Sequence, residues 1–174
     1  MISLVSFYNS LNREEKSWFY AAGYGDMAKC KVSDITGAAA NLNYNKHYET
    51  SLKLLDYGFE YAKNREEIAQ FHIGYALNYE KLKDIEKCNY HCEEAVKLQH
   101  DGTYAYQRLI INYVKAKDWK NALRACDIVF KNEKVFDHRG FFKDKPSQWE
   151  ELRSYALKRK EFILKKIDQN YDRI

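Results

Sequence analysis

The most suggestive chemistry in the sequence is a short run that combines cysteine and histidine. Cys88, His91 and Cys92 offer thiols and an imidazole, which are the ligands that zinc prefers. On a helix, Cys88 and Cys92 share one face, whereas the His91 side chain points roughly 80–100° away from them. Both cysteines also fall at positions that are expected to pack between helices. We therefore predict buried small hydrophobic side chains here and no metal site.

A second segment, residues 23–29, contains two glycines and a lysine and has the look of a phosphate-binding loop. The glycine-lysine-hydroxyl ending that cradles a phosphate is missing, and no strand precedes the segment. The sequence predicts a turn between helices at this position instead.

Polar side chains also gather where Asp137 precedes His138 and Arg139. A histidine beside an aspartate can act as a general base, but no nucleophile motif accompanies this pair. The remaining four histidines share no spacing: His47, His72, His91 and His100. Because no convergent catalytic set is visible, we predict that the chain is not an enzyme, has no catalytic residue and needs no cofactor.

Basic residues form a stripe near the C-terminus, at Lys158, Arg159, Lys160, Lys165 and Lys166. Such a stripe can contact phosphates or an acidic partner. Acidic residues in the same stretch dilute it, so a solvated helix face is the favoured interpretation. A nucleic-acid-linked or ligand-sensing regulatory role, which would use this basic helix, is kept as the alternative function.

The composition is that of a globular chain of 174 residues, with 45% apolar and 31% charged residues. One proline and seven glycines permit long helices almost everywhere. The net charge of +4 is too small to indicate nucleic-acid binding by itself. We see no signal peptide, no apolar stretch of about 18 residues and no secreted disulfide pattern. These features predict a reducing, cytoplasmic compartment and no membrane association.

An internal repeat organises the middle of the chain. Residues 78–84 recur as residues 112–118, at an offset of 34 residues and with five of seven positions identical. Apolar residues in each copy lie three or four apart on both sides of a polar turn, at 83–84 or 117–118, which indicates two antiparallel helices. Such a pair cannot bury its apolar face alone and must stack on neighbours.

These copies resemble the tetratricopeptide repeat (TPR) family, whose unit of about 34 residues has small residues where its two helices cross. The matching positions are Ala76, Tyr79, Cys88 and Ala95 in one copy, and Tyr113 and Ala122 in the next. A weaker copy, in which the turn is about two residues shorter, includes Asn43, Tyr48, Ser51, Leu55 and Gly58.

The resemblance implies an all-α fold in which antiparallel helix pairs build a short right-handed α-solenoid with flanking helices at both ends. We expect one TPR-like domain over 1–174, beginning with an N-terminal helical segment at 1–32. The repeats would follow at 33–64, 65–102 and 103–136, and a C-terminal capping helix at 147–170.

In the TPR family, the first helices of successive repeats line a concave groove that holds a peptide. Carried over by position, the resemblance implies a scaffold or adaptor that binds a protein or peptide partner, with nucleic acid as a weaker partner class. An apolar floor and a cationic rim would suit hydrophobic anchors with acidic flanks. The groove residues would be Ile73, Leu77, Lys81, Tyr104, Gln107, Arg108, Ile111 and Lys115.

Overall fold

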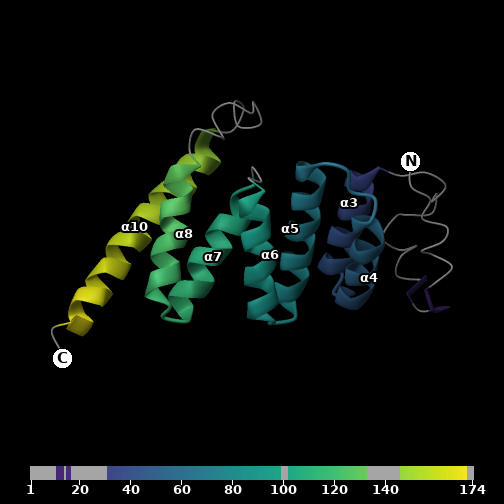
Figure 1. Ribbon diagram of the computed structural model, residues 1–174. Coiled ribbons are helices and arrows are strands. Elements are labelled where there is room, and N and C mark those ends of the chain that lie inside the picture. The colour runs from purple at the N-terminus through teal and green to yellow at the C-terminus, as the bar shows by residue number, and fades with distance from the viewer. Residues whose placement is uncertain (1–10, 14, 17–30, 99–101, 133–145, 172–174) are drawn as a thin grey trace. The chain divides into compact units, whose positions relative to one another are not determined.

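The computed structural model describes residues 11–13, 15–16, 31–98, 102–132 and 146–171. Within these residues all regular structure is helical, which confirms the predicted all-α class (Figure 1). The contacts divide the chain into two compact units, 1–98 and 99–174, and each is described by itself. The predicted turn at 23–29 and the polar cluster at 137–139 lie outside the described residues, as does most of the N-terminal segment.

The first unit contains four helices: α3 (Val32–Tyr44), α4 (Tyr48–Phe59), α5 (Arg65–Lys81) and α6 (Ile85–Lys97) (Figure 1). Helix α3 forms a hairpin with α4, and α5 forms a second hairpin with α6. Because α5 packs against both α3 and α4, the two hairpins share one core.

The second unit contains α7 (Thr103–Lys115) and α8 (Trp119–Lys131), which form a third hairpin, and the long helix α10 (Pro146–Tyr171). Helix α10 covers the stretch predicted as the final helix and packs against both α7 and α8. Aromatic pairs join it to the hairpin, with ring centroids 6.0 Å apart for Tyr106 and Trp149 and 6.4 Å apart for Trp119 and Phe162.

All three hairpins turn through the same backbone geometry. The middle residue of each turn is a lysine in the left-handed region, with φ of 69° at Lys46, 62° at Lys83 and 57° at Lys117. The amide of the next residue donates to a carbonyl five residues back, in the pattern of a Schellman C-cap. These bonds join His47 to Leu42, Asp84 to Tyr79, and Asp118 to Tyr113.

The first hairpin therefore does not have the shortened turn that the sequence suggested. Its turn occupies residues 45–47 and has the same length as the turns at 82–84 and 116–118. The repeats differ in the length of their helices and not of their turns. The first helix of one repeat, α5, has 17 residues, whereas the first helix of the next, α7, has 13. Measured from the turn, Asn41 rather than Asn43 is the counterpart of Asn78, since each accepts the amide four residues later.

Small residues occupy the points where the first two helices cross. Ala39, Ser51 and Gly58 are buried, and the Ser51 hydroxyl donates to the Ala39 carbonyl at 2.7 Å. A Cβ on Gly58 would lie 2.6 Å from Ile35 Cγ2 and 2.9 Å from the Phe71 ring. The backbones can approach this closely only because these side chains are small. Their counterparts in the second hairpin are also buried: Ala76, Cys88 and Ala95.

A buried polar network joins α3, α4 and α5 within this core. The Asn78 amide nitrogen donates to the Ser51 hydroxyl and to the Gly74 carbonyl, both at 2.9 Å. The Asn43 amide nitrogen donates to Asn78 Oδ1 at 3.1 Å. Asn78 is only 1% exposed, so these bonds satisfy polar atoms that water does not reach.

Candidate functional site

The α5 part of the predicted groove forms a stripe along one helix. Ile73 and Leu77 are half-buried and Lys81 is exposed, and their spacing of four residues places them on one face. The adjacent Gly74 packs tightly, because a Cβ there would lie 2.8 Å from Leu55 Cδ2 of α4. The stripe is therefore bordered on one side by the packed core of the first unit.

The α7 part of the predicted groove forms a similar stripe in the second unit. Tyr104, Arg108 and Ile111 are half-buried, whereas Gln107 and Lys115 are exposed. The Arg108 guanidinium lies over the Tyr104 ring, with Cζ 5.5 Å from the ring centroid. Two side chains one helical turn apart thus lie against each other at the surface.

A cluster that sequence reasoning missed lies between α5 and α6. Nδ1 of His72 lies 2.9 Å from Nδ1 of His91, so one ring donates and the other accepts. The His91 ring stacks on Tyr75 and Tyr79, with centroid distances of 4.7 and 5.5 Å. The Tyr75 hydroxyl in turn donates to Asp56 Oδ1 at 2.7 Å, which ties the cluster to α4.

The sequence does contain a signal for this pair. His72 lies ten residues before Leu82, the first turn residue, and His91 lies seven residues after Asp84, the last turn residue. In an antiparallel hairpin, residues at similar distances from the turn face each other, and the difference here is less than one helical turn of about 3.6 residues. The histidines looked scattered because they were compared by their spacing along the chain rather than by their distances from the turn.

The surroundings of the cluster favour neutral imidazoles. Burial is the main cause that lowers the pKa of His91 to about 4, and the nearby His72 contributes to this shift. Burial is also the main cause that lowers the pKa of His72. Glu94 opposes the shift at both rings, whereas Lys87 lowers the pKa of His91 and Lys97 that of His72.

The lowered pKa values predict that the first unit loses stability as pH falls from about 6.5 toward 4. The unfolded chain takes up protons in this range that the folded cluster excludes, so the contribution is fully present above 6.5. For His91 we expect a loss of about 1–2 kcal/mol, after allowing for solvent screening of a half-exposed ring. Urea unfolding followed between pH 7.5 and 4.5 measures this loss.

The matched variant is His91→Phe, which keeps an aromatic ring against Tyr75 and Tyr79 but cannot titrate. Its stability should fall less than that of the wild-type chain over the same pH range. His47→Gln, which removes a histidine outside the cluster, should keep the wild-type dependence. Parallel pH profiles for the wild type and His91→Phe would contradict the assignment.

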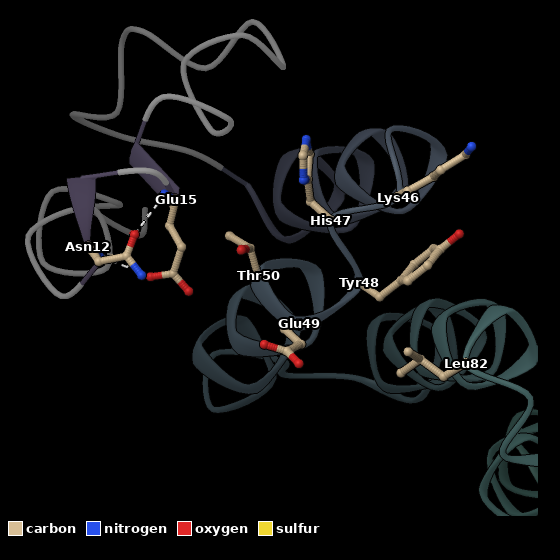
Figure 2. A pocket seen from close by; sticks show the side chains of 8 residues that line it. All are labelled: Asn12, Glu15, Lys46, His47, Tyr48, Glu49, Thr50 and Leu82. Carbon is tan, nitrogen blue, oxygen red and sulfur yellow. Dashed lines mark hydrogen bonds between the residues drawn. The ribbon is translucent and has the colours of Figure 1, made fainter.

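A cavity of about 290 Å³ opens at the N-terminal end of α4 (Figure 2). In this view the Asn12 and Glu15 side chains lie on one side of it, and Tyr48 and Leu82 lie on the other. It combines residues from three separate stretches of the first unit: Asn12, Glu15, Lys46, His47, Tyr48, Glu49, Thr50 and Leu82.

The wall formed by residues 12 and 15 is internally satisfied. Asn12 and Glu15 form a capping box, in which each backbone amide donates to the other side chain, at 3.0 and 2.9 Å. The Glu15 carboxylate, only 6% exposed, also pairs with Lys53 of α4. That hydrogen bond from Lys53 holds the pKa of Glu15 below its usual value.

Thr50 differs from the other polar groups of this cavity. The residue is 1% exposed, and its hydroxyl has no hydrogen-bond partner within the described part of the chain. A buried hydroxyl without a partner is destabilising and needs an explanation.

The three cysteines in the described helices are buried thiols that form no disulfide within the described residues, as predicted for packing residues: Cys88, Cys92 and Cys126. Burial raises the pKa of the Cys126 thiol to about 11, which keeps it protonated and unreactive. Across the described ranges, no group of three or more histidine, cysteine or acidic side chains is arranged to hold a metal ion. No described helix is long and apolar enough to cross a bilayer.

Comparison of the chain with protein-family models, with curated proteins and with solved structures found no match.

Proposed function

We propose that the chain is a protein-interaction scaffold of the tetratricopeptide type. In this proposal its hairpins stack as a short right-handed solenoid, and a peptide segment of a partner protein lies on the stripes of α5 and α7. The repeated hairpin supports the proposal most directly, because the same turn and the same buried small residues recur along the chain. Repeats of this kind present successive first helices on one face.

The chemistry of the two stripes indicates what such a peptide would contain. Half-buried Ile73, Leu77 and Ile111 offer apolar surface for hydrophobic anchors. The charged members of the predicted set, Lys81, Arg108 and Lys115, are all cationic, so acidic residues would flank those anchors. Tyr104 and Arg108 are of the residue types that most often dominate binding energy at interfaces.

The alternative role for the basic C-terminal helix receives less support. Lys160 donates to Asp127 Oδ1 of α8 at 2.6 Å, and the Arg159 guanidinium lies over the Tyr155 ring. Lys166 lies over the ring of Phe162. Three of the five cations in the stripe thus contact other side chains of the second unit. Fewer of them are left to bind phosphates.

We expect that Tyr104→Ala/Arg108→Ala weakens partner capture by about 2 kcal/mol or more, which is roughly a 30-fold change in affinity. The fold should persist, because neither side chain belongs to the buried core. Pull-downs from host lysate, followed by affinity measurement with the captured partner, test this expectation. Circular dichroism checks that the variant remains helical.

The matched control is Lys158→Ala/Lys165→Ala, which removes two exposed cations of α10 and keeps the ion pair of Lys160. This variant should capture partners as the wild type does. Loss of capture only in the α10 variant, together with a steep dependence on salt, would favour the regulatory alternative.

A further inference from the structure

The N-terminus of the second helix is capped differently in the three hairpins. Asp84 Oδ1 accepts the backbone amide of Lys87 at 3.0 Å, and Asp118 Oδ1 accepts that of Asn121 at 3.1 Å. Each aspartate follows the left-handed lysine and serves as an N-cap. In α4 the equivalent residue is His47, whose side chain makes no capping hydrogen bond. The carboxylate found at two of these helix ends is therefore missing from the third.

The missing carboxylate leaves the first-turn amides of α4 without the side-chain acceptor that α6 and α8 have. The first amides of a helix have no partner inside the helix, and the residues that carry them in α4, Tyr48, Glu49 and Thr50, all line the cavity. The buried Thr50 hydroxyl also has no partner among the residues described and lines the same cavity (Figure 2). This hydroxyl is a second observation, independent of the helix end, and it calls for an acceptor at the same place.

The charged side chains around the cavity are compatible with one bound anion. The carboxylate of Glu15 is already held by Lys53 and by the Asn12 amide. Two further charged residues of opposite sign, Glu49 and Lys46, also line the cavity. The partial positive charge at the N-terminus of α4 then favours an anion at the amides.

The cavity also contains apolar surface that could hold the body of a ligand. Leu82, from the turn between α5 and α6, is 43% exposed and lines the cavity together with Tyr48. A volume of about 290 Å³ admits a small molecule or the last residues of a peptide. A carboxylate bound at the amides would place an adjoining apolar group within reach of these side chains.

We propose that this cavity binds the carboxylate of an organic acid with an apolar body, and that the carboxylate caps α4 as Asp84 caps α6 and Asp118 caps α8. The carboxylate oxygens accept from the first-turn amides and from the Thr50 hydroxyl. Two sources supply this chemistry, a free small carboxylic acid and the C-terminus of a peptide. None of the stripe residues of α5 and α7 lines this cavity, so the proposal stands whether or not they bind a peptide.

The test uses the full chain and two matched probes, N-acetyl-leucine and N-acetyl-leucinamide, which differ only in the carboxylate. Titration followed by amide NMR should show saturable binding of N-acetyl-leucine in the millimolar range, with the largest shifts at residues 48–50. The amide probe should bind at least tenfold more weakly. Equal binding of the two probes, or no binding of the acid, would overturn the proposal.

Two variants test whether the carboxylate binds at the N-terminus of α4. His47→Asp supplies the missing cap from within the chain, so it should stabilise α4 and weaken N-acetyl-leucine binding at least tenfold. Thr50→Val removes the hydroxyl at nearly constant shape and should weaken binding several-fold. Its control is Thr36→Val, because the Thr36 hydroxyl already donates to the Ser33 carbonyl at 3.1 Å. Unchanged binding in folded His47→Asp or Thr50→Val would refute the site.

A third arm distinguishes the two sources of the carboxylate. A tetrapeptide that ends in leucine, with its N-terminus acetylated, is compared with N-acetyl-leucine. Tighter binding of the peptide, with shifts extending beyond residues 46–50, assigns the site to a peptide C-terminus. Equal affinity assigns it to a small acid. Amidation of the same peptide should weaken its binding at least tenfold, and unchanged binding of the amidated peptide would contradict the proposal.

Discussion

Replacing Gly58 with leucine should lower the free energy of unfolding of the first unit by about 3 kcal/mol. Even a Cβ at this position would lie 2.6 Å from Ile35 Cγ2 and 2.9 Å from the Phe71 ring, well inside normal contact. Ile35 and Phe71 are fully buried, so neither can move aside without disturbing its own neighbours. A lower urea midpoint at an unchanged slope measures the effect.

The variant Gly58→Ala makes this test sharper because two effects oppose each other. In an open helix interior, alanine in place of glycine raises stability by up to about 1 kcal/mol. At the crossing of α3, α4 and α5, the clash should reverse that sign. A higher midpoint for Gly58→Ala would show that the helices do not cross as closely as the structure has them.

Asn78→Leu is expected to have a comparable effect, about 3 kcal/mol, for a different physical reason. Leucine is similar in size but removes the acceptor of the Asn43 amide and the donor to the Ser51 hydroxyl. Buried polar groups are then left without partners, and each typically destabilises a protein by about 1–3 kcal/mol. Thermal or urea unfolding of the purified variant measures the loss.

A double-mutant cycle separates the network from simple packing. Asn43→Leu/Asn78→Leu removes both partners of one bond, so it should be less destabilising than the sum of the single variants. Strict additivity would mean that the Asn43 and Asn78 side chains do not interact in solution. The fold of each variant is verified by its helical circular dichroism.

The helices and their turns could be predicted from the sequence because their signals are local. Asp84 and Asp118 are the last residues of the repeated motif, and both cap the next helix as such residues do. The 34-residue offset indicated which cysteines would be buried, since packing positions recur with the repeat. These inferences needed only residues a few positions apart or one repeat length apart.

The candidate sites depend on distances that a one-dimensional pattern does not contain. The cavity at α4 joins residue 15 to residue 50 and residue 82, and no periodicity connects these segments. The partnerless hydroxyl of Thr50 is equally invisible, because a threonine in the first turn of a helix is ordinary in sequence. The first repeat was aligned incorrectly for a related reason. Asn43 was matched to Asn78 because the neighbouring residue types agree, whereas the position equivalent to Asn78 is Asn41.

The extra length of α5 shows how this chain can change its repeat without losing its packing. α5 is four residues longer than α7 (17 against 13), close to one full turn of about 3.6 residues. Adding a whole turn preserves the rotational phase of the helix, so buried and exposed faces keep their directions. Adding one or two residues would rotate every later side chain by about 100° per residue. The helices of these repeats can therefore change in length only by whole turns. The N-terminal end of α5 is where another turn could be inserted.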